Sequence, residues 1–67
     1  MKIHINGEHH TIKTNLKLRE LFQELGFADR GTAVELNGRI VEKEMWSSTV
    51  LSEGDKLEIV SAVGGGV

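Results

Sequence analysis

The stretch LRELFQELG, residues 18–26, holds the most regular pattern in this chain of 67 residues. Its apolar side chains recur at intervals of three and four residues, the spacing that gathers one face of an α-helix. Asn15 is a residue type that favours helix N-caps, and Gly26 stands where a left-handed residue ends a helix. We therefore predict one amphipathic helix whose apolar stripe is Leu18, Leu21, Phe22 and Leu25.

Before this helix the chain carries the signals of a β-hairpin. Ile3 and Ile5 alternate with polar residues, which is the period of a half-buried strand. Asn6-Gly7 follows at once, and both residue types tolerate the positive φ that tight hairpin turns require. We expect residues 10–13 to return as the second strand, with Ile12 facing the core.

After the helix, three further strand segments are predicted. Residues 33–36 form one, followed by a second Asn-Gly pair at residues 37–38, beyond which Ile40 and Val41 continue. Residues 42–48 are expected to be irregular or to form a short helical turn. Alternation over residues 56–61 predicts the last strand.

This order of elements is an α+β pattern, and it fits a β-grasp (ubiquitin-like) fold with a mixed sheet of four to five strands packed on one helix. In such a sheet the first and last strands lie parallel and side by side at the centre. We expect one β-grasp domain over residues 1–61 and a flexible glycine-rich tail over residues 62–67. Trp46 and Met45 leave two interpretations open: a cap on the core, or an exposed anchor for a partner.

Composition excludes several classes of function. The chain has 8 basic and 10 acidic residues and no cysteine, a balance that argues against nucleic-acid binding and removes thiolate chemistry. It lacks an apolar run of the roughly 20 residues that cross a bilayer, and its N-terminus does not resemble a signal peptide. We expect a cytoplasmic protein without membrane or nucleic-acid partners.

No cluster in the sequence predicts catalysis or a metal site. Adjacent histidines on a strand point to opposite faces, whereas metal ligands must converge. The acidic residues near the turns are interpreted as solvated surface, because so small a domain has little room for a substrate pocket. We predict no catalytic residue, no metal site and no stably bound cofactor. The residues considered are His4, His9, His10, Glu42, Glu44, Glu53 and Asp55.

Three consecutive glycines, Gly64, Gly65 and Gly66, follow Val63 near the end of the sequence and precede Val67. Glycines near a chain end can simply belong to a disordered terminus without a function. Alternatively, a backbone without Cβ atoms can pass through a slot in a partner protein, so that its carboxylate reaches a nucleotide. Transfer to AMP would turn this carboxylate into an activated acyl group that a sulfur nucleophile can attack.

The chain resembles the ThiS family of sulfur carriers in thiamine biosynthesis. The resemblance covers nearly the whole chain and depends on the order and spacing of common elements, which include Ile5-Asn6-Gly7, the helix of residues 18–26, Val34 to Gly38, Ile40-Val41, Trp46, Thr49, Leu51, Gly54-Asp55, Glu58 to Val60 and Ala62 to Gly66.

The resemblance implies a carrier that is a co-substrate and not an enzyme. A ThiF-like activating adenylyltransferase would use ATP and magnesium to adenylate Gly66, while residues 63–66 enter partner active sites. A persulfide donor would convert Gly66 to a thiocarboxylate, and a ThiG-like thiazole synthase would receive the sulfur. Because the chain lacks cysteine, that sulfur must come from another protein.

Val67 departs from the family pattern, which ends on glycine. We expect a C-terminal peptidase to remove Val67 and leave Gly66 as the working terminus. This departure keeps other functions open: a sulfur carrier for molybdopterin or amino-acid synthesis, a ubiquitin-like protein modifier, or a noncovalent binding module.

Overall fold

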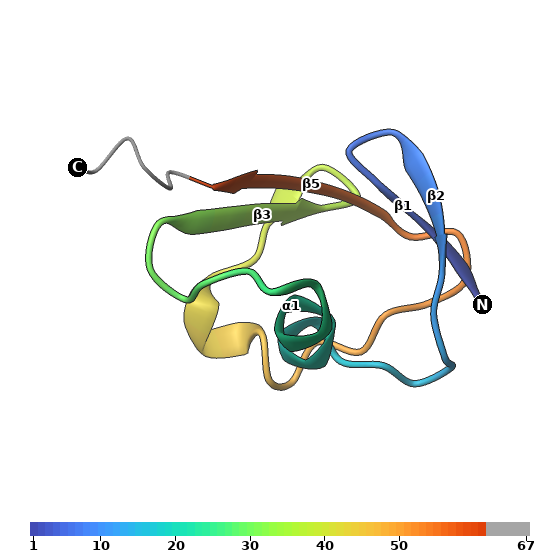
Figure 1. Cartoon of the computed structure of the whole chain (residues 1–67), viewed down its shortest axis with the longest axis horizontal. Coiled ribbons are helices and arrows are strands. Elements are labelled where there is room, and N and C mark those ends of the chain that lie inside the picture. The colour runs from blue at the N-terminus through green and yellow to red at the C-terminus, as the bar shows by residue number, and fades with distance from the viewer. Residues whose placement is uncertain (62–67) are drawn as a thin grey trace.

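Five strands and one α-helix form the regular structure of residues 1–61, the part of the chain that this computed structural model describes (Figure 1). A hairpin comes first, then the helix, then a second hairpin and the last strand. One turn of 3-10 helix, η1, precedes that strand. The bounds are β1 Lys2–Ile5, β2 Glu8–Thr11, α1 Leu18–Leu25, β3 Thr32–Leu36, β4 Arg39–Ile40, η1 Lys43–Met45 and β5 Lys56–Ser61.

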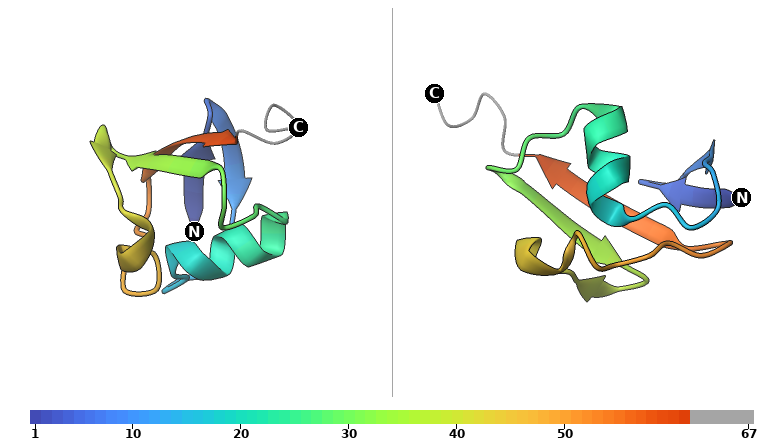
Figure 2. Two further views of the ribbon diagram at one scale, coloured as in Figure 1. Left: turned by 90° about the vertical axis from the view of Figure 1, so that its left-hand side faces the viewer. Right: turned by 90° about the horizontal axis from the view of Figure 1, so that it is seen from below.

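The strands form a single mixed sheet in the order β2-β1-β5-β3-β4. The last strand, β5, lies in the middle, parallel to β1 and antiparallel to β3. Helix α1 packs across one face, so the domain has two layers and the other face of the sheet has no covering element among residues 1–61 (Figures 1 and 2). The predicted mixed sheet with one helix is confirmed.

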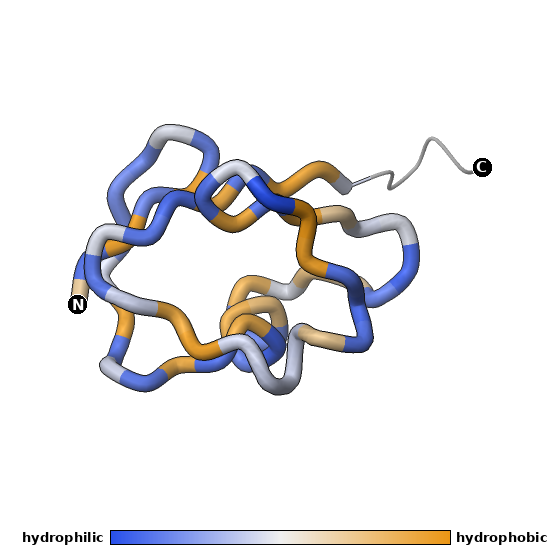
Figure 3. Tube along the Cα trace, turned by 180° about the vertical axis from the view of Figure 1, so that it is seen from behind, coloured by the Kyte–Doolittle hydropathy of each residue, from blue (hydrophilic) through white to orange (hydrophobic). Residues whose placement is uncertain are grey.

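The core lies between α1 and the inner face of the sheet. Val34, Leu57 and Ile59 point inward from β3 and β5 and are at most 6% exposed, and apolar segments of sheet and helix face one another in Figure 3. Three members of the predicted stripe of α1 are buried, but Leu25 is 43% exposed. Leu25 borders an open hollow beside the β1–β2 hairpin, so this end of the apolar stripe is partly exposed.

Trp46 belongs to the core. Its ring is 1% exposed and meets Phe22 edge-on, with ring centroids 4.6 Å apart. The indole N–H donates to the carbonyl oxygen of Val41 at 3.0 Å, so its polar atom is satisfied. The core interpretation of Trp46 is therefore confirmed and the exposed-anchor one is wrong, whereas Met45 is 54% exposed.

The start of the helix was predicted wrongly. Asn15 adopts a left-handed φ of 63°, and α1 begins after Lys17, whose N–H donates to the Glu20 carboxylate at 2.8 Å. The entry is fixed by tertiary pairing, because Lys17 bridges to Val50 and the Leu18 N–H donates to the carbonyl of Thr49. The predicted helix end is confirmed: Gly26 has φ 81° and its N–H donates to the carbonyl of Phe22.

The second strand begins two residues earlier than predicted. The two-residue Asn6-Gly7 turn pairs Ile5 directly with Glu8, and the ladder continues to Thr11. Ile12 lies just beyond the strand but still packs against the core.

Both Asn-Gly turns bind β5 through the asparagine side chain. The Asn6 carboxamide oxygen accepts from the Ile59 N–H at 2.7 Å, and its NH2 donates to the Ile59 carbonyl at 3.1 Å. On the other flank, the Asn37 oxygen accepts from the Lys56 N–H at 2.9 Å and its NH2 donates to Asp55 at 3.0 Å. Asn6 and Asn37 adopt φ of 50° and 53°, which asparagine tolerates better than most residues. The two carboxamides thus extend the hydrogen bonding of β5 where its neighbouring strands turn away.

This arrangement predicts that Asn6→Gly destabilises the domain although glycine suits the positive φ. The substitution leaves the part-buried N–H and carbonyl of Ile59 without protein partners, at a cost of about 1–3 kcal/mol. Asn15→Gly is the matched control, because Asn15 shares the positive φ and no side-chain hydrogen bond to it is found in residues 1–61. We expect the control to change the free energy of unfolding by less than about 1 kcal/mol. Equal losses in urea unfolding of the two variants would contradict the role given to the Asn6 carboxamide.

Candidate functional site

The predicted site residues lie just beyond the end of β5. Ser61 is the last residue of that strand and of the described chain, so Val63, Gly64, Gly65, Gly66 and Val67 lie outside the described residues. The structure describes the end of the sheet to which these residues are joined.

The direction of β5 at its end is fixed by β3. Thr32 pairs with Ser61 and Ala33 with Val60, so the antiparallel ladder reaches the last described residue. The end of β5 and the N-terminus lie on opposite sides of the domain (Figure 1). The chain after Ser61 therefore leaves from one defined end of the sheet.

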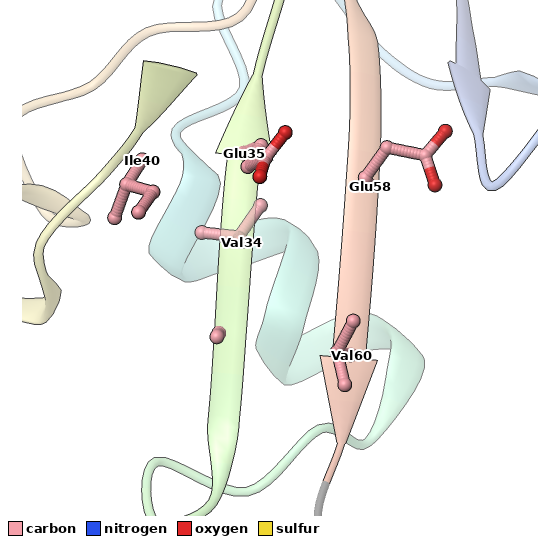
Figure 4. A pocket seen from close by; sticks show the side chains of 6 residues that line it. Val34, Glu35, Ile40, Glu58 and Val60 are labelled. Carbon is pink, nitrogen blue, oxygen red and sulfur yellow. The ribbon is translucent and has the colours of Figure 1, made fainter. Parts of the chain in front are cut away.

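The outer face of the sheet, the face away from α1, carries an apolar patch beside this end. Val60 on β5 is 67% exposed and Ile40 on β4 is 71% exposed, with β3 between the two strands. Together with Ala33 they border a hollow of about 130 Å³ (Figure 4). We call Ala33, Ile40 and Val60 the outer patch.

Two carboxylates flank the outer patch. Glu35 on β3 and Glu58 on β5 are register partners, and both line the same hollow (Figure 4). Like charges directly opposite each other on a sheet are destabilising. Within residues 1–61 the one ion pair found joins Arg19 to Asp29, so neither glutamate has a basic partner there. This is an anionic pair set in an apolar surface.

The histidines lie on the hairpin, away from the outer patch. His4 and His9 are register partners with ring centroids 4.3 Å apart, and His10 lines a separate hollow beside Leu25. Residues 1–61 contain no group of three or more His, Cys, Asp or Glu side chains placed to hold a metal ion.

Two of the acidic residues near the turns have structural roles. Asp55 accepts hydrogen bonds from Asn37 and from the Ser52 N–H, and Glu53 accepts from the Lys2 N–H at 3.0 Å. Glu42 and Glu44 are exposed. The described part of the chain also contains no helix long and apolar enough to cross a membrane.

A mixed sheet with parallel β1 and β5 at its centre and one helix on a single face defines a β-grasp protein. A crystal structure of the thiamine biosynthesis protein ThiS from Geobacter metallireducens superposes with a TM-score of 0.83, at 32% identity, covering 97% of this chain and 99% of that one. The model of the ThiS family matches residues 3–66. The chain therefore belongs to the ThiS family.

Two curated relatives carry this domain within a longer chain. Thiazole synthases from Magnetococcus marinus and Paramagnetospirillum magneticum are each 42% identical over 66 residues, which is 98% of this chain and 20% of theirs. The chain thus spans about a fifth of the length of these relatives. The sulfur carrier protein ThiS of Escherichia coli is 26% identical over its whole length and over 98% of this chain.

The Glu35–Glu58 pair gives a prediction for stability. Glu35→Gln keeps the size of the side chain but removes one of two opposed charges, so we expect the free energy of unfolding to rise by about 0.2–1 kcal/mol at low salt. The gain should shrink as salt screens the repulsion that remains in the parent protein. Urea unfolding at two salt concentrations measures this. A loss of stability at both would show that Glu35 makes a favourable contact instead.

Proposed function

We propose that this protein is a sulfur carrier of thiamine biosynthesis that bears sulfur as a thiocarboxylate on Gly66. The observation that carries the proposal is the place of the glycines: Gly64 to Gly66 follow by only a few residues the strand held at the centre of the sheet. Membership of the ThiS family, and the printed names of the relatives, supply the pathway.

The glycines suit a carrier because they have no Cβ atoms. A narrow channel that admits an extended backbone would exclude most side chains, and glycine also places few limits on φ and ψ. The sheet meanwhile supplies a rigid body that a partner can bind. The protein would present a narrow reactive segment attached to a rigid domain, and its partner enzymes would catalyse the reactions.

The chemistry begins with a carboxylate, which is a poor electrophile. A ThiF-like adenylyltransferase would join the Gly66 carboxylate to AMP from ATP, with release of pyrophosphate and with magnesium bound to the nucleotide phosphates. A persulfide sulfur from a donor protein would then attack the acyl carbon and displace AMP. Cleavage of the resulting S–S bond by a thiol leaves the thiocarboxylate on Gly66.

The sulfur donor must be a second protein, since this chain has no cysteine. The acceptor we propose is a ThiG-like thiazole synthase, which fits the relatives that hold both units in one chain. In such a chain the tether would raise the effective concentration of carrier at the synthase. We place the protein in the cytoplasm, where ATP and reduced thiols are available.

Val67 follows Gly66 in the sequence, so a Gly66 carboxylate requires hydrolysis of the Gly66–Val67 peptide bond. The match to the family model also ends at Gly66. Valine is β-branched, with two heavy atoms on its Cβ, and fits poorly into a channel made for glycine. We therefore propose that a peptidase removes Val67 before activation.

We predict that the adenylyltransferase encoded in the same genome activates a chain ending at Gly66 and fails to activate the chain ending at Val67. ATP–pyrophosphate exchange measures activation directly. A Gly65→Val variant ending at Gly66 tests the need for a thin backbone, and we expect it to lose at least about 100-fold in kcat/KM, because misplaced reacting atoms forfeit orientation. Equal activation of the chains ending at Gly66 and at Val67 would overturn the processing step. Absence of activation in both would overturn the carrier function.

A further inference from the structure

The β1–β2 hairpin places two imidazole rings, those of His4 and His9, side by side on its surface. We propose that this pair binds a transition-metal dication of the kind that prefers imidazole ligands, Zn²⁺, Ni²⁺ or Cu²⁺, with water in the remaining coordination positions. The inference is independent of the proposed function, because the hairpin takes no part in the steps proposed for Gly66.

The register of the sheet brings the two rings together. β1 and β2 pair antiparallel, with His4 directly opposite His9. Register partners project from the same face of a sheet, with Cβ atoms about 4.5–5.5 Å apart. Because the neighbouring Ile3 points into the core, His4 and His9 lie on the outer face. The sequence-based prediction of no metal site considered adjacent histidines such as His9 and His10, whereas this pair converges across two strands.

The separation of the rings is close to what one shared ion requires. Their centroids lie 4.3 Å apart and their planes are inclined by 56°. With metal–nitrogen bonds of about 2.0–2.1 Å, two imidazoles at adjacent positions of one ion have ring centres about 4.5–5 Å apart. A small rotation of the exposed His9 side chain supplies the difference. Since the strands hold both rings in place, the second metal–nitrogen bond forms within one molecule and gains in effective concentration.

The His4 ring also has a nitrogen without a partner. Its Nδ1 is shielded from solvent and has no hydrogen-bond partner among residues 1–61. Shielded nitrogens of this kind are uncommon in folded proteins and unfavourable when left unpaired. A metal ion seated between the two rings would supply the missing partner, and imidazole is the commonest metal ligand among side chains.

The donor set selects the class of ion. In the part of the chain that the structure describes, no group of three or more His, Cys, Asp or Glu side chains is placed to hold an ion, so water must complete the coordination. Mg²⁺ and Ca²⁺ require oxygen ligands, whereas imidazole suits zinc, nickel and copper. Lys56 is the register partner of His4 on β5 and adds positive charge nearby, which further disfavours ions that bind by charge alone. Cu²⁺ should bind more tightly than Ni²⁺ or Zn²⁺.

The test is calorimetric titration of the full chain with the chloride salts of Zn²⁺, Ni²⁺ and Cu²⁺. We expect one ion per chain, and a loss of affinity of at least about ten-fold in His4→Gln and in His9→Gln, because each variant removes one of two linked ligands. Mg²⁺ should not bind. His10→Gln is the matched control: His10 follows His9 in the sequence but pairs with the buried Ile3 and faces the side of α1. This control should keep the affinity of the parent chain.

A second measurement locates the ion. Zn²⁺ is diamagnetic, so NMR can follow each histidine ring through the titration. We expect the ring resonances of His4 and His9 to shift together while those of His10 stay in place. Thermal unfolding in the presence of a chelator checks that every variant is folded before its affinity is compared.

Three results would overturn the inference. The first is a parent chain that binds none of the three ions. The second is a His9→Gln variant that binds as tightly as the parent, which would assign the ion to His4 and the N-terminal amine. The third is an equal loss in the His10→Gln control, which would indicate diffuse contact with all the histidines. None of these results bears on activation of Gly66, so the carrier function is tested separately.

Discussion

The fold depends on one constraint, which is that its last strand must be held from both sides at the centre of the sheet. β5 pairs with β1 on one flank and β3 on the other, and these neighbours come from distant parts of the chain. Where each neighbour turns away, an asparagine carboxamide continues the bonding, from Asn6 to Ile59 and from Asn37 to Lys56. The segment that follows Ser61 therefore leaves from a fixed point on a rigid body.

This arrangement assigns different roles to the folded domain and to the glycine segment that follows it in the sequence. Under the proposed function, the domain would provide position and recognition, while the glycines after β5 would provide a backbone thin enough to enter another protein. The helix and Trp46 fill one face of the sheet and leave the other uncovered within residues 1–61, with the outer patch and the Glu35–Glu58 pair upon it.

Most of the fold could be predicted from sequence because its signals are local. Two Asn-Gly turns, an amphipathic helix ending in glycine and a final alternating strand fix the order of the elements. Asn15 was misjudged because the pairing of Lys17 with Val50, which sets the start of α1, is a tertiary contact. The Glu35–Glu58 pair was missed because alternation places each residue on a polar face, whereas only the register of β3 and β5 sets them opposite each other. The glycine site, in contrast, was predicted from composition and resemblance, and it lies outside the described residues.

The central claim is that Gly66 carries sulfur as the last residue of a processed chain. The intact mass of the protein purified from its own host during thiamine synthesis tests it most directly. The account predicts a chain that ends at Gly66, together with a fraction in which one oxygen is replaced by sulfur. A chain that still contains Val67 and shows no sulfur increment under the same conditions would contradict it.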